Sequence, residues 1–196
     1  RRGERGPGGE TGGLSEPPVA AFDVNGRRAG LVLENAKRLG LERLIRVHVR
    51  DAREVRPEEF GRFSRVLVDA PCTGTGVLRR RPDLRWQKGP EDIAALVIAQ
   101  REILASAARL VEPGGSLVYS TCSLEPEENF ENARWFLERF PEFRPWPLAG
   151  DLPEPARSRI EKGRFALEGA AVQLAPHLDD ADGIFIFRTV HPIDGK

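Results

Sequence analysis

Apolar and polar positions alternate along the chain in a rhythm that predicts short buried strands, each followed by a helix. Residues 19–22 form an apolar run that ends at Asp23, and residues 27–39 carry apolar side chains at helical spacing ahead of Gly40. A glycine directly after such a segment is typical of a helix C-terminus. The same pattern predicts strands at 45–49, 66–68 and 116–120, and helices at 90–111 and 127–140.

This alternation of strands and helices predicts an α/β fold whose sheet is mostly parallel and carries helices on both faces. Two apolar segments near the end of the chain, 171–174 and 184–190, are expected to pair as an antiparallel hairpin. Residues 1–13 are rich in glycine and arginine and have no apolar periodicity. They are therefore expected to be irregular, and residues 14–196 to form one folded domain.

Composition is that of an ordinary globular protein. The 196 residues suffice for a domain with its own core. Two cysteines argue against a secreted disulfide scaffold, and no apolar run is long enough for a membrane span or a signal peptide. The expected compartment is therefore the cytoplasm. Methionine is absent even at position 1, which predicts that part of the N-terminus is missing.

Overall charge gives no sign of nucleic-acid binding, because 30 basic and 30 acidic residues leave a formal net charge of zero. Nearly all the basic residues are arginine, whose planar fork suits phosphates and stacks on bases. Codon usage in a GC-rich genome explains the same bias more simply. Function is therefore sought in local motifs.

Three predicted strands are each followed by an aspartate. These residues are Asp23, Asp51 and Asp69. In open α/β sheets, ligands bind outside the carboxyl ends of the strands. Each aspartate alone is equally well explained as the cap of the next helix. Three at equivalent strand ends favour a polar ligand with several donors, such as a nucleoside.

Both cysteines stand in turns that follow predicted strands. Cys72 lies in the segment Asp-Ala-Pro-Cys-Thr-Gly-Thr-Gly (69–76), and Cys122 lies in Ser-Thr-Cys-Ser-Leu-Glu-Pro-Glu-Glu-Asn (120–129). Inert cysteines are more often buried as small apolar residues, so we expect a reactive thiol. A turn that opens onto a helix N-terminus lowers the pKa of a thiol. The helix expected from Glu127 would act in this way on Cys122.

Other functions fit these motifs less well. A cysteine hydrolase needs a basic partner, and His48, His177 and His191 stand in no recognisable arrangement with either cysteine. The two cysteines lack the spacing of a metal site, so no metal is expected. The glycines near the start lack the G-x-G-x-x-G pattern of a nicotinamide-dependent oxidoreductase.

The two cysteine turns, with Arg-Arg-Arg-Pro-Asp-Leu-Arg-Trp (79–86) between them, resemble those of the RsmB/Fmu (Sun, NOL/NOP) family of RNA cytosine-5 methyltransferases. Leu-Ala-Pro-His (174–177) and Asp-Gly-Ile-Phe (182–185) extend the resemblance, which runs from about Gly6 to the end. It is closest to the RsmB branch, which acts on bacterial small-subunit ribosomal RNA. The resemblance implies a Rossmann-like class I methyltransferase sheet, S-adenosylmethionine as cofactor and ribosomal RNA as partner. We also expect a monomer.

The resemblance implies a role for each cysteine. C5 of cytosine is a poor nucleophile, and a thiolate that adds to C6 enables C5 to attack the methyl group of the cofactor. The family's nucleophile is the cysteine of the Thr-Cys-Ser turn, here Cys122. The cysteine after proline, here Cys72, assists release. Asp69 would hold the base through N3 and N4.

Further site residues follow from the same resemblance. Asp23 would hold the cofactor ribose, Asp51 would lie near the adenine, and Arg28 would support the pocket, with Asp69 at its edge. The cofactor loop would comprise Gly6, Pro7, Gly8 and Gly9. RNA would be contacted by phosphate pairing and stacking, and a solvated loop is the alternative for that segment. The residues concerned are Arg79, Arg80, Arg81, Arg85 and Trp86.

The cofactor loop departs from the family's pattern of a strand, an acid and Ala-Pro-Gly-Gly-Lys-Thr. Glu10 stands in the place of the lysine, and no apolar strand precedes the loop, so the first strand of the sheet is expected to be missing. An extra carboxylate would repel the carboxylate of the cofactor. The alternative function is therefore a catalytically weak RNA-binding fragment or pseudo-enzyme of the same family.

Overall fold

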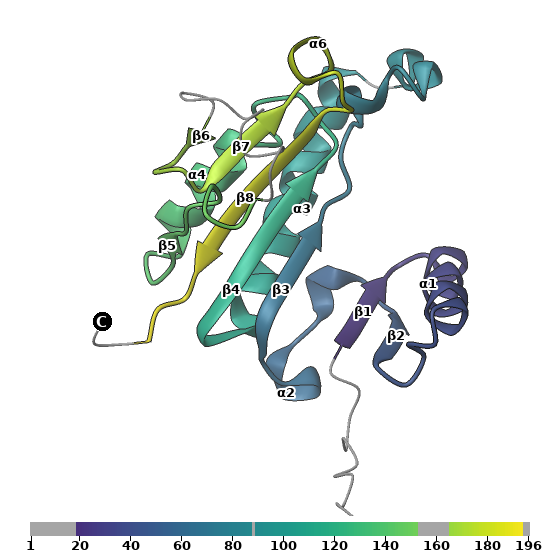
Figure 1. The fold of residues 1–196 in the computed structure, drawn as a ribbon, viewed down its shortest axis with the longest axis vertical. Helices are drawn as coiled ribbons and strands as arrows, with labels where there is room; N and C mark the ends of the chain where they lie inside the picture. Colours follow the sequence, from purple (N-terminus) through teal and green to yellow (C-terminus); the bar gives the residue numbers. More distant parts are fainter. Residues whose placement is uncertain (1–18, 88, 153–164, 194–196) are drawn as a thin grey trace, which may run out of the picture. The chain divides into compact units, whose positions relative to one another are not determined.

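The computed structural model describes residues 19–87, 89–152 and 165–193. The chain divides into two compact units, Arg1–Asp51 and Ala52–Lys196, which are taken in turn (Figure 1). The expected irregular segment 1–13 lies outside the described residues. No helix in the described ranges combines the length and the apolar character needed to cross a membrane.

In the first unit, two parallel strands accompany one helix. Strand β1 (Val19–Asp23) pairs with β2 (Ile45–Val49), and α1 (Gly26–Arg38) connects them. Helix α1 begins after Asn25, whose side chain accepts hydrogen bonds from two backbone N–H groups of the first turn. It ends before Gly40, whose φ of 68° suits a residue without a Cβ. The strands and the helix predicted here are confirmed.

The second unit is built on a six-stranded sheet with the order β3-β4-β8-β7-β6, to which β5 adds by pairing with β8. Its strands are β3 (Phe63–Asp69), β4 (Val111–Thr121), β5 (Arg144–Pro145), β6 (Phe165–Ala166), β7 (Ala171–Leu174) and β8 (Ile184–Val190). Strands β3 and β4 are parallel, whereas the pairs that involve β5 to β8 are antiparallel. The predicted hairpin is confirmed as β7 and β8.

Two long helices provide most of the helical packing against this sheet. The second unit contains η1 (Ala52–Glu54), α2 (Pro57–Phe60), η2 (Thr75–Val77), η3 (Pro82–Trp86), α3 (Pro90–Leu110), α4 (Phe130–Arg139) and α6 (Pro176–Asp179). Figure 1 shows α3 and α4 behind the sheet. The core between them includes Leu104, Leu117, Tyr119, Phe136 and Phe187, all fully buried. Burial of such side chains is the main source of folding free energy.

The predicted α/β class is confirmed, and the starts of β3, β4 and α4 differ from the prediction, at Phe63, Val111 and Phe130. Strand β4 begins at Val111, before Gly114 and Gly115, because Val111 pairs with Phe63 of β3 across a register shift. The C-terminal segment adds contacts to the two glycines. His191 accepts a hydrogen bond from Gly114 N (2.6 Å) and donates one to Gly115 O (2.9 Å). Helix α4 begins at Phe130 instead of residue 127, and residues 126–129 form turns.

Candidate active site

The two cysteine turns meet beyond the carboxyl ends of β3 and β4. These strands are parallel neighbours, with Asp69 opposite Ser120, so the segments that follow them leave the sheet side by side. The Sγ atoms of Cys72 and Cys122 lie 3.4 Å apart, within hydrogen-bond reach for sulfur. Both thiols are free and half-buried. The structure thus brings together the two residues that the sequence singled out.

Backbone contacts fix the two turns against each other. Gly76 N donates to Cys122 O (2.9 Å), and Gly183 N donates to Gly76 O (2.8 Å). A Cβ at Gly76 would lie 2.7 Å from both Cys122 O and Gly183 O, so only glycine fits here without a shift of backbone. The Thr75 hydroxyl also accepts from Leu124 N at 2.9 Å. The thiol pair is therefore held by a tightly packed frame.

The two thiols differ in acidity because one donates to the other. With the Cys72 S–H as donor, the hydrogen bond lowers the pKa of Cys122 to about 7, against the opposing effect of burial. The same hydrogen bond and burial raise the pKa of Cys72. Cys122 is therefore the more acidic of the two thiols.

The predicted source of this acidity was wrong in one respect. Helix α4 begins at Phe130, eight positions after Cys122, so the thiol does not lie at the helix N-terminus. Pro126, Glu128 and Asn129 instead take part in turn and side-chain hydrogen bonds that delay the helix. The neighbouring thiol takes the place of the helix terminus as the cause of the lowered pKa.

Asp69 lies at the end of β3 beside the thiol pair. Its Oδ1 accepts a hydrogen bond from Ser120 Oγ (3.0 Å), which orients the carboxylate. The negative charge of Asp69 acts to raise the pKa of Cys122, which indicates its proximity. An exposed carboxylate next to a nucleophilic thiol is suited to accept hydrogen bonds from a flat polar ligand.

A buried polar network beneath Cys72 was not predicted. Its centre is Glu128, which accepts hydrogen bonds from Thr73 and Gln100 and is fully buried. In the sequence Glu128 cannot be distinguished from its neighbours in the acidic run 125–128. Gln100 did carry a signal, because it interrupts an apolar stretch in the middle of α3.

In the first unit, Asp23 and Arg28 form a two-pronged ion pair. Arg28 Nε donates to Asp23 Oδ2 and Nη2 donates to Oδ1, each at 2.8 Å, and Asn25 N also donates to Oδ1 at 2.7 Å. The hydrogen bond from Arg28 lowers the pKa of Asp23 despite some desolvation. Since a carboxylate has about four acceptor positions, Oδ2 retains one for a hydroxyl donor.

Asp51 lies on the same edge of this unit as Asp23. In the parallel register Asp23 is opposite Val49, and Arg50 N donates to Asp23 O at 3.1 Å, so Asp51 follows directly beyond the carboxyl end of β2. Asp23, with Arg28 of α1 paired to it, and Asp51 thus lie at the carboxyl ends of the two neighbouring strands. The predicted loop residues Gly6, Pro7, Gly8 and Gly9 lie outside the described residues.

The arginine segment 79–86 carries ion pairs of its own. Arg79 and Arg80 both reach Asp182, through Nε at 2.6 Å and 2.8 Å. Arg81 lies 3.6 Å from Asp83. Beyond them, Trp86 is 84% exposed, and the Arg85 guanidinium lies 5.5 Å from its ring centroid. An exposed indole and a guanidinium at its face form a surface on which bases stack.

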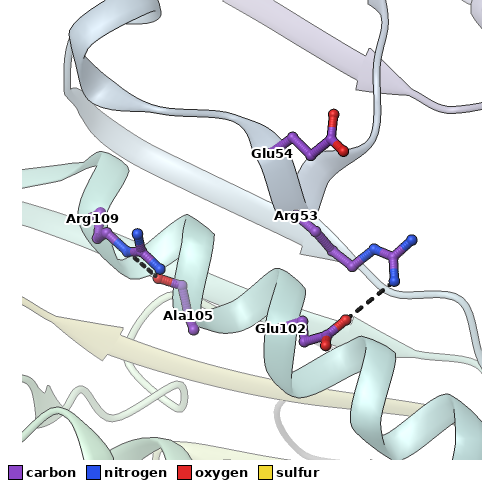
Figure 2. A pocket seen from close by; sticks show the side chains of 5 residues that line it. All are labelled: Arg53, Glu54, Glu102, Ala105 and Arg109. Carbon is purple, nitrogen blue, oxygen red and sulfur yellow. Dashed lines mark hydrogen bonds and ion pairs between the residues drawn. The ribbon is translucent and has the colours of Figure 1, made fainter.

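A separate hollow of about 510 Å³ lies beside α3, away from both cysteines, and is lined by Arg53, Glu54, Glu102, Ala105 and Arg109 (Figure 2). Its charges are mutually compensated, since Arg53 Nη1 contacts Glu102 Oε2 at 3.1 Å. None of the predicted site residues lines it. Within the described ranges, no group of three or more potential ligands is placed to hold a metal ion.

Most of the chain, including both cysteine turns, is similar to known proteins. The sequence matches the family described as 16S rRNA methyltransferase RsmB/F over residues 5–189. It is 39% identical over 187 residues to the probable ribosomal RNA small subunit methyltransferase B of Bacillus subtilis, covering 92% of this chain and 40% of the relative. It is 45% identical over 139 residues to the ribosomal RNA small subunit methyltransferase B of Thermus thermophilus, covering 71% and 34%. The chain thus spans about two fifths of the first relative's length, and less of the second.

Solved structures show the same fold. A crystal structure of NSun6 from Pyrococcus horikoshii with SFG matches at a TM-score of 0.72 and 28% identity, covering 89% of this chain and 41% of that one. A methyltransferase homologue from Pyrococcus horikoshii matches at a TM-score of 0.67 and 32% identity, covering 87% and 52%.

Proposed function

The chain belongs to the RsmB/F family of S-adenosylmethionine-dependent 16S rRNA methyltransferases, and from this premise we propose that it transfers a methyl group to C5 of a cytosine in small-subunit ribosomal RNA. The observation that carries the proposal is the pair of thiols, 3.4 Å apart, in which a hydrogen bond from Cys72 lowers the pKa of Cys122 to about 7. Cytosine C5 becomes reactive only when a nucleophile adds to C6, and a thiolate is the side chain suited to that addition.

Cys122 is the attacking group in this mechanism. Its thiolate adds to C6 of the target cytosine, which breaks the C5–C6 π bond and leaves an electron pair available at C5. S-adenosylmethionine, when bound, supplies the electrophilic methyl group. Half-burial limits hydration of the sulfur, and the Cys72 donor maintains the thiolate without a cationic partner.

Cys72 serves the reverse step. When a water molecule takes up the C5 proton, the C5–H electron pair re-forms the C5–C6 double bond, and the bond between Cys122 and C6 breaks with the thiolate as leaving group. The Cys72 S–H, whose pKa is raised, can then donate its hydrogen bond to the departing sulfur. Its removal should leave addition possible and slow release, so the two cysteines have distinct roles in the proposal.

Asp69 positions the base. Its carboxylate, fixed by Ser120 Oγ at 3.0 Å, is available to accept hydrogen bonds from the N4 amino group and from a protonated N3. A proton taken up from water at N3 balances the negative charge that thiolate addition places on the ring. Asp69 is therefore proposed as a residue that both selects cytosine and stabilises the adduct.

The first unit is proposed to hold the cofactor. The Asp23 carboxylate, oriented by Arg28 and Asn25, has an acceptor position left for a ribose hydroxyl. Asp51, at the same edge, is placed to contact the adenine side of the nucleoside. Gly6 to Gly9 are proposed to approach the rest of the cofactor, as in the family pattern.

The RNA is proposed to cross the segment 79–86. Trp86 with Arg85 offers a stacking surface, and Arg79, Arg80 and Arg81 offer charge for phosphates. Because Arg79 and Arg80 share Asp182, phosphates would compete with a carboxylate already present. Salt dependence of RNA binding reports on this competition.

Product analysis tests the proposal directly. The protein is incubated with S-adenosylmethionine and a small-subunit ribosomal RNA transcript, and the RNA is digested to nucleosides for mass spectrometry. We expect 5-methylcytosine as the product. A methyl group on another atom would refute the thiolate mechanism. Absence of product together with absence of cofactor binding in calorimetry would instead favour the RNA-binding pseudo-enzyme.

A further inference from the structure

Glu128 is a buried acidic residue that the chemistry above leaves unused. Its carboxylate accepts hydrogen bonds from Thr73 N at 3.0 Å, from Thr73 Oγ1 at 2.5 Å and from Gln100 Nε2 at 2.8 Å. Burial of a carboxylate is costly unless such donors compensate it. Two of the three donors belong to the residue that immediately follows Cys72.

Gln100 holds the residue on the other side of Cys72. Its Nε2 donates both to Glu128 and to Pro71 O, each at 2.8 Å. Its own orientation is fixed by Asn132, whose Nδ2 donates to Gln100 Oε1 at 2.8 Å. One pair of buried side chains, Glu128 and Gln100, therefore grips the backbone directly before and directly after Cys72.

We propose that Glu128 is a positioning residue for the thiol pair. With Gln100 it clamps residues 71–73, so that the Cys72 sulfur stays within hydrogen-bond reach of the Cys122 sulfur. The inference rests on the proposed function only in treating the thiol pair as the reactive centre. Glu128 acts by positioning Cys72 and is not proposed to contact the substrate.

The direction in which the pKa of Cys122 changes when Glu128 is removed distinguishes a positioning role from a plain charge effect. The negative charge of Glu128 by itself raises the pKa of Cys122, so its loss alone would lower that pKa. Loss of the clamp has the opposite effect, because the Cys72 hydrogen bond is the largest cause of the lowered pKa. A positioning role therefore predicts a rise when Glu128 is removed.

The experiment measures alkylation of Cys122 by iodoacetamide against pH, with the modified site resolved by mass spectrometry. In Glu128→Ala we expect the midpoint to move from about 7 toward the ordinary thiol value of about 8.5, a roughly ten-fold loss of reactivity at neutral pH. The matched control Glu127→Ala removes an exposed carboxylate one position away and should leave the midpoint unchanged. Glu128→Gln keeps an acceptor oxygen and should retain most of the low midpoint.

The same substitution in a Cys72→Ala variant completes a double-mutant cycle. In that variant the hydrogen-bond donor is already absent, so Glu128→Ala should not raise the pH midpoint of Cys122 alkylation any further. Should Glu128→Ala fail to fold by circular dichroism, Thr73→Val removes only the hydroxyl donor and should raise the midpoint by a smaller amount. An unchanged or lowered alkylation midpoint in folded Glu128→Ala overturns the proposal. The proposal is also overturned if Glu128→Ala raises the midpoint by the same amount when Cys72 has been replaced by alanine. The assay needs neither RNA nor cofactor, so its outcome is independent of whether 5-methylcytosine is formed.

Discussion

The sulfur atoms of Cys72 and Cys122 lie 3.4 Å apart although fifty positions separate the residues in the chain. The parallel register of β3 and β4 sets this distance, since Asp69 and Ser120 are opposite each other and each cysteine follows within three residues. Because one thiol donates and the other accepts, two chemically identical side chains acquire different acidities.

This asymmetry predicts selective modification. Near pH 7 a limiting amount of iodoacetamide should alkylate Cys122 and spare Cys72, because only Cys122 has a substantial thiolate population there. The thiolate fraction rises with pH through about 7, so the rate at Cys122 should fall roughly ten-fold for each unit below pH 6. Peptide mapping by mass spectrometry measures both sites. Preferential labelling of Cys72 would reverse the assignment of donor and acceptor.

Gly76→Ala should disturb the thiol pair through packing alone. The new Cβ would lie 2.7 Å from the carbonyl oxygens of Cys122 and Gly183, and backbone cannot move aside cheaply. We expect a loss of about 1–3 kcal/mol in the free energy of unfolding, measured by urea denaturation. Gly30→Ala is the matched control, because a Cβ there meets nothing within 4 Å. Equal stabilities of the two variants would contradict the described packing of the turns.

Most bounds of the strands and helices can be predicted from local sequence patterns. The bounds that cannot be predicted have a common cause. The bounds of β2, the helix α1 and the hairpin of β7 and β8 follow from apolar periodicity and terminal residues. The starts of β4 and α4 do not, because distant partners set them. Pairing of Val111 with Phe63 extends β4 back past two glycines, and a turn forms where Glu128 reaches Thr73.

The candidate site likewise has features that the sequence predicts and features that only the fold reveals. The cysteines and the strand-end aspartates were found because their chemistry and their position after a strand are both visible in the sequence. The acidity of Cys122 was traced to a helix terminus, whereas its largest cause is a thiol that only the fold brings near. The ion pairs of Arg79 and Arg80 with Asp182 could not be predicted from the sequence either, because about a hundred positions separate the partners.

Asp23→Asn should weaken cofactor binding. The amide keeps the shape of the carboxylate but loses its charge, so the Arg28 pair and the acceptor proposed for the ribose both weaken. Calorimetry with S-adenosylmethionine should show about ten-fold weaker binding, the scale of one charge-assisted hydrogen bond. Glu34→Gln, on the exposed side of α1, is the control. Equal affinities of Asp23→Asn and the parent would remove Asp23 from the proposed pocket.

The same ion pair predicts a pH effect on the first unit. The pKa of Asp23 is lowered in the folded chain, so its pairing stabilises the fold above the ordinary value of 3.8. That contribution is lost as the pH falls through the lower folded pKa. Thermal melts of the parent and Asp23→Asn should therefore converge as the solution becomes more acidic. A difference that grows with acidity would contradict the assigned pair.

Replacing Arg79, Arg80 and Arg81 together by alanine should weaken RNA binding and flatten its salt dependence. Each arginine that no longer neutralises a phosphate reduces the slope of log K against log salt by about 0.7–0.9. Asp182→Asn is the opposite change, since it removes the carboxylate that both Arg79 and Arg80 contact and should strengthen binding at low salt. Filter binding at several salt concentrations measures both variants. Identical slopes for the parent and the triple variant would identify the segment as a solvated loop.

The identity of the nucleophile is tested most directly by the capture of a covalent complex between protein and RNA. The parent, Cys122→Ala and Cys72→Ala are each incubated with S-adenosylmethionine and small-subunit ribosomal RNA, and denaturing gels report any adduct. Cys72→Ala should accumulate the adduct, because addition by Cys122 proceeds while release of its sulfur is slowed. Cys122→Ala should form none and transfer no methyl group. An adduct in Cys122→Ala and none in Cys72→Ala would contradict the assignment of Cys122 as the nucleophile.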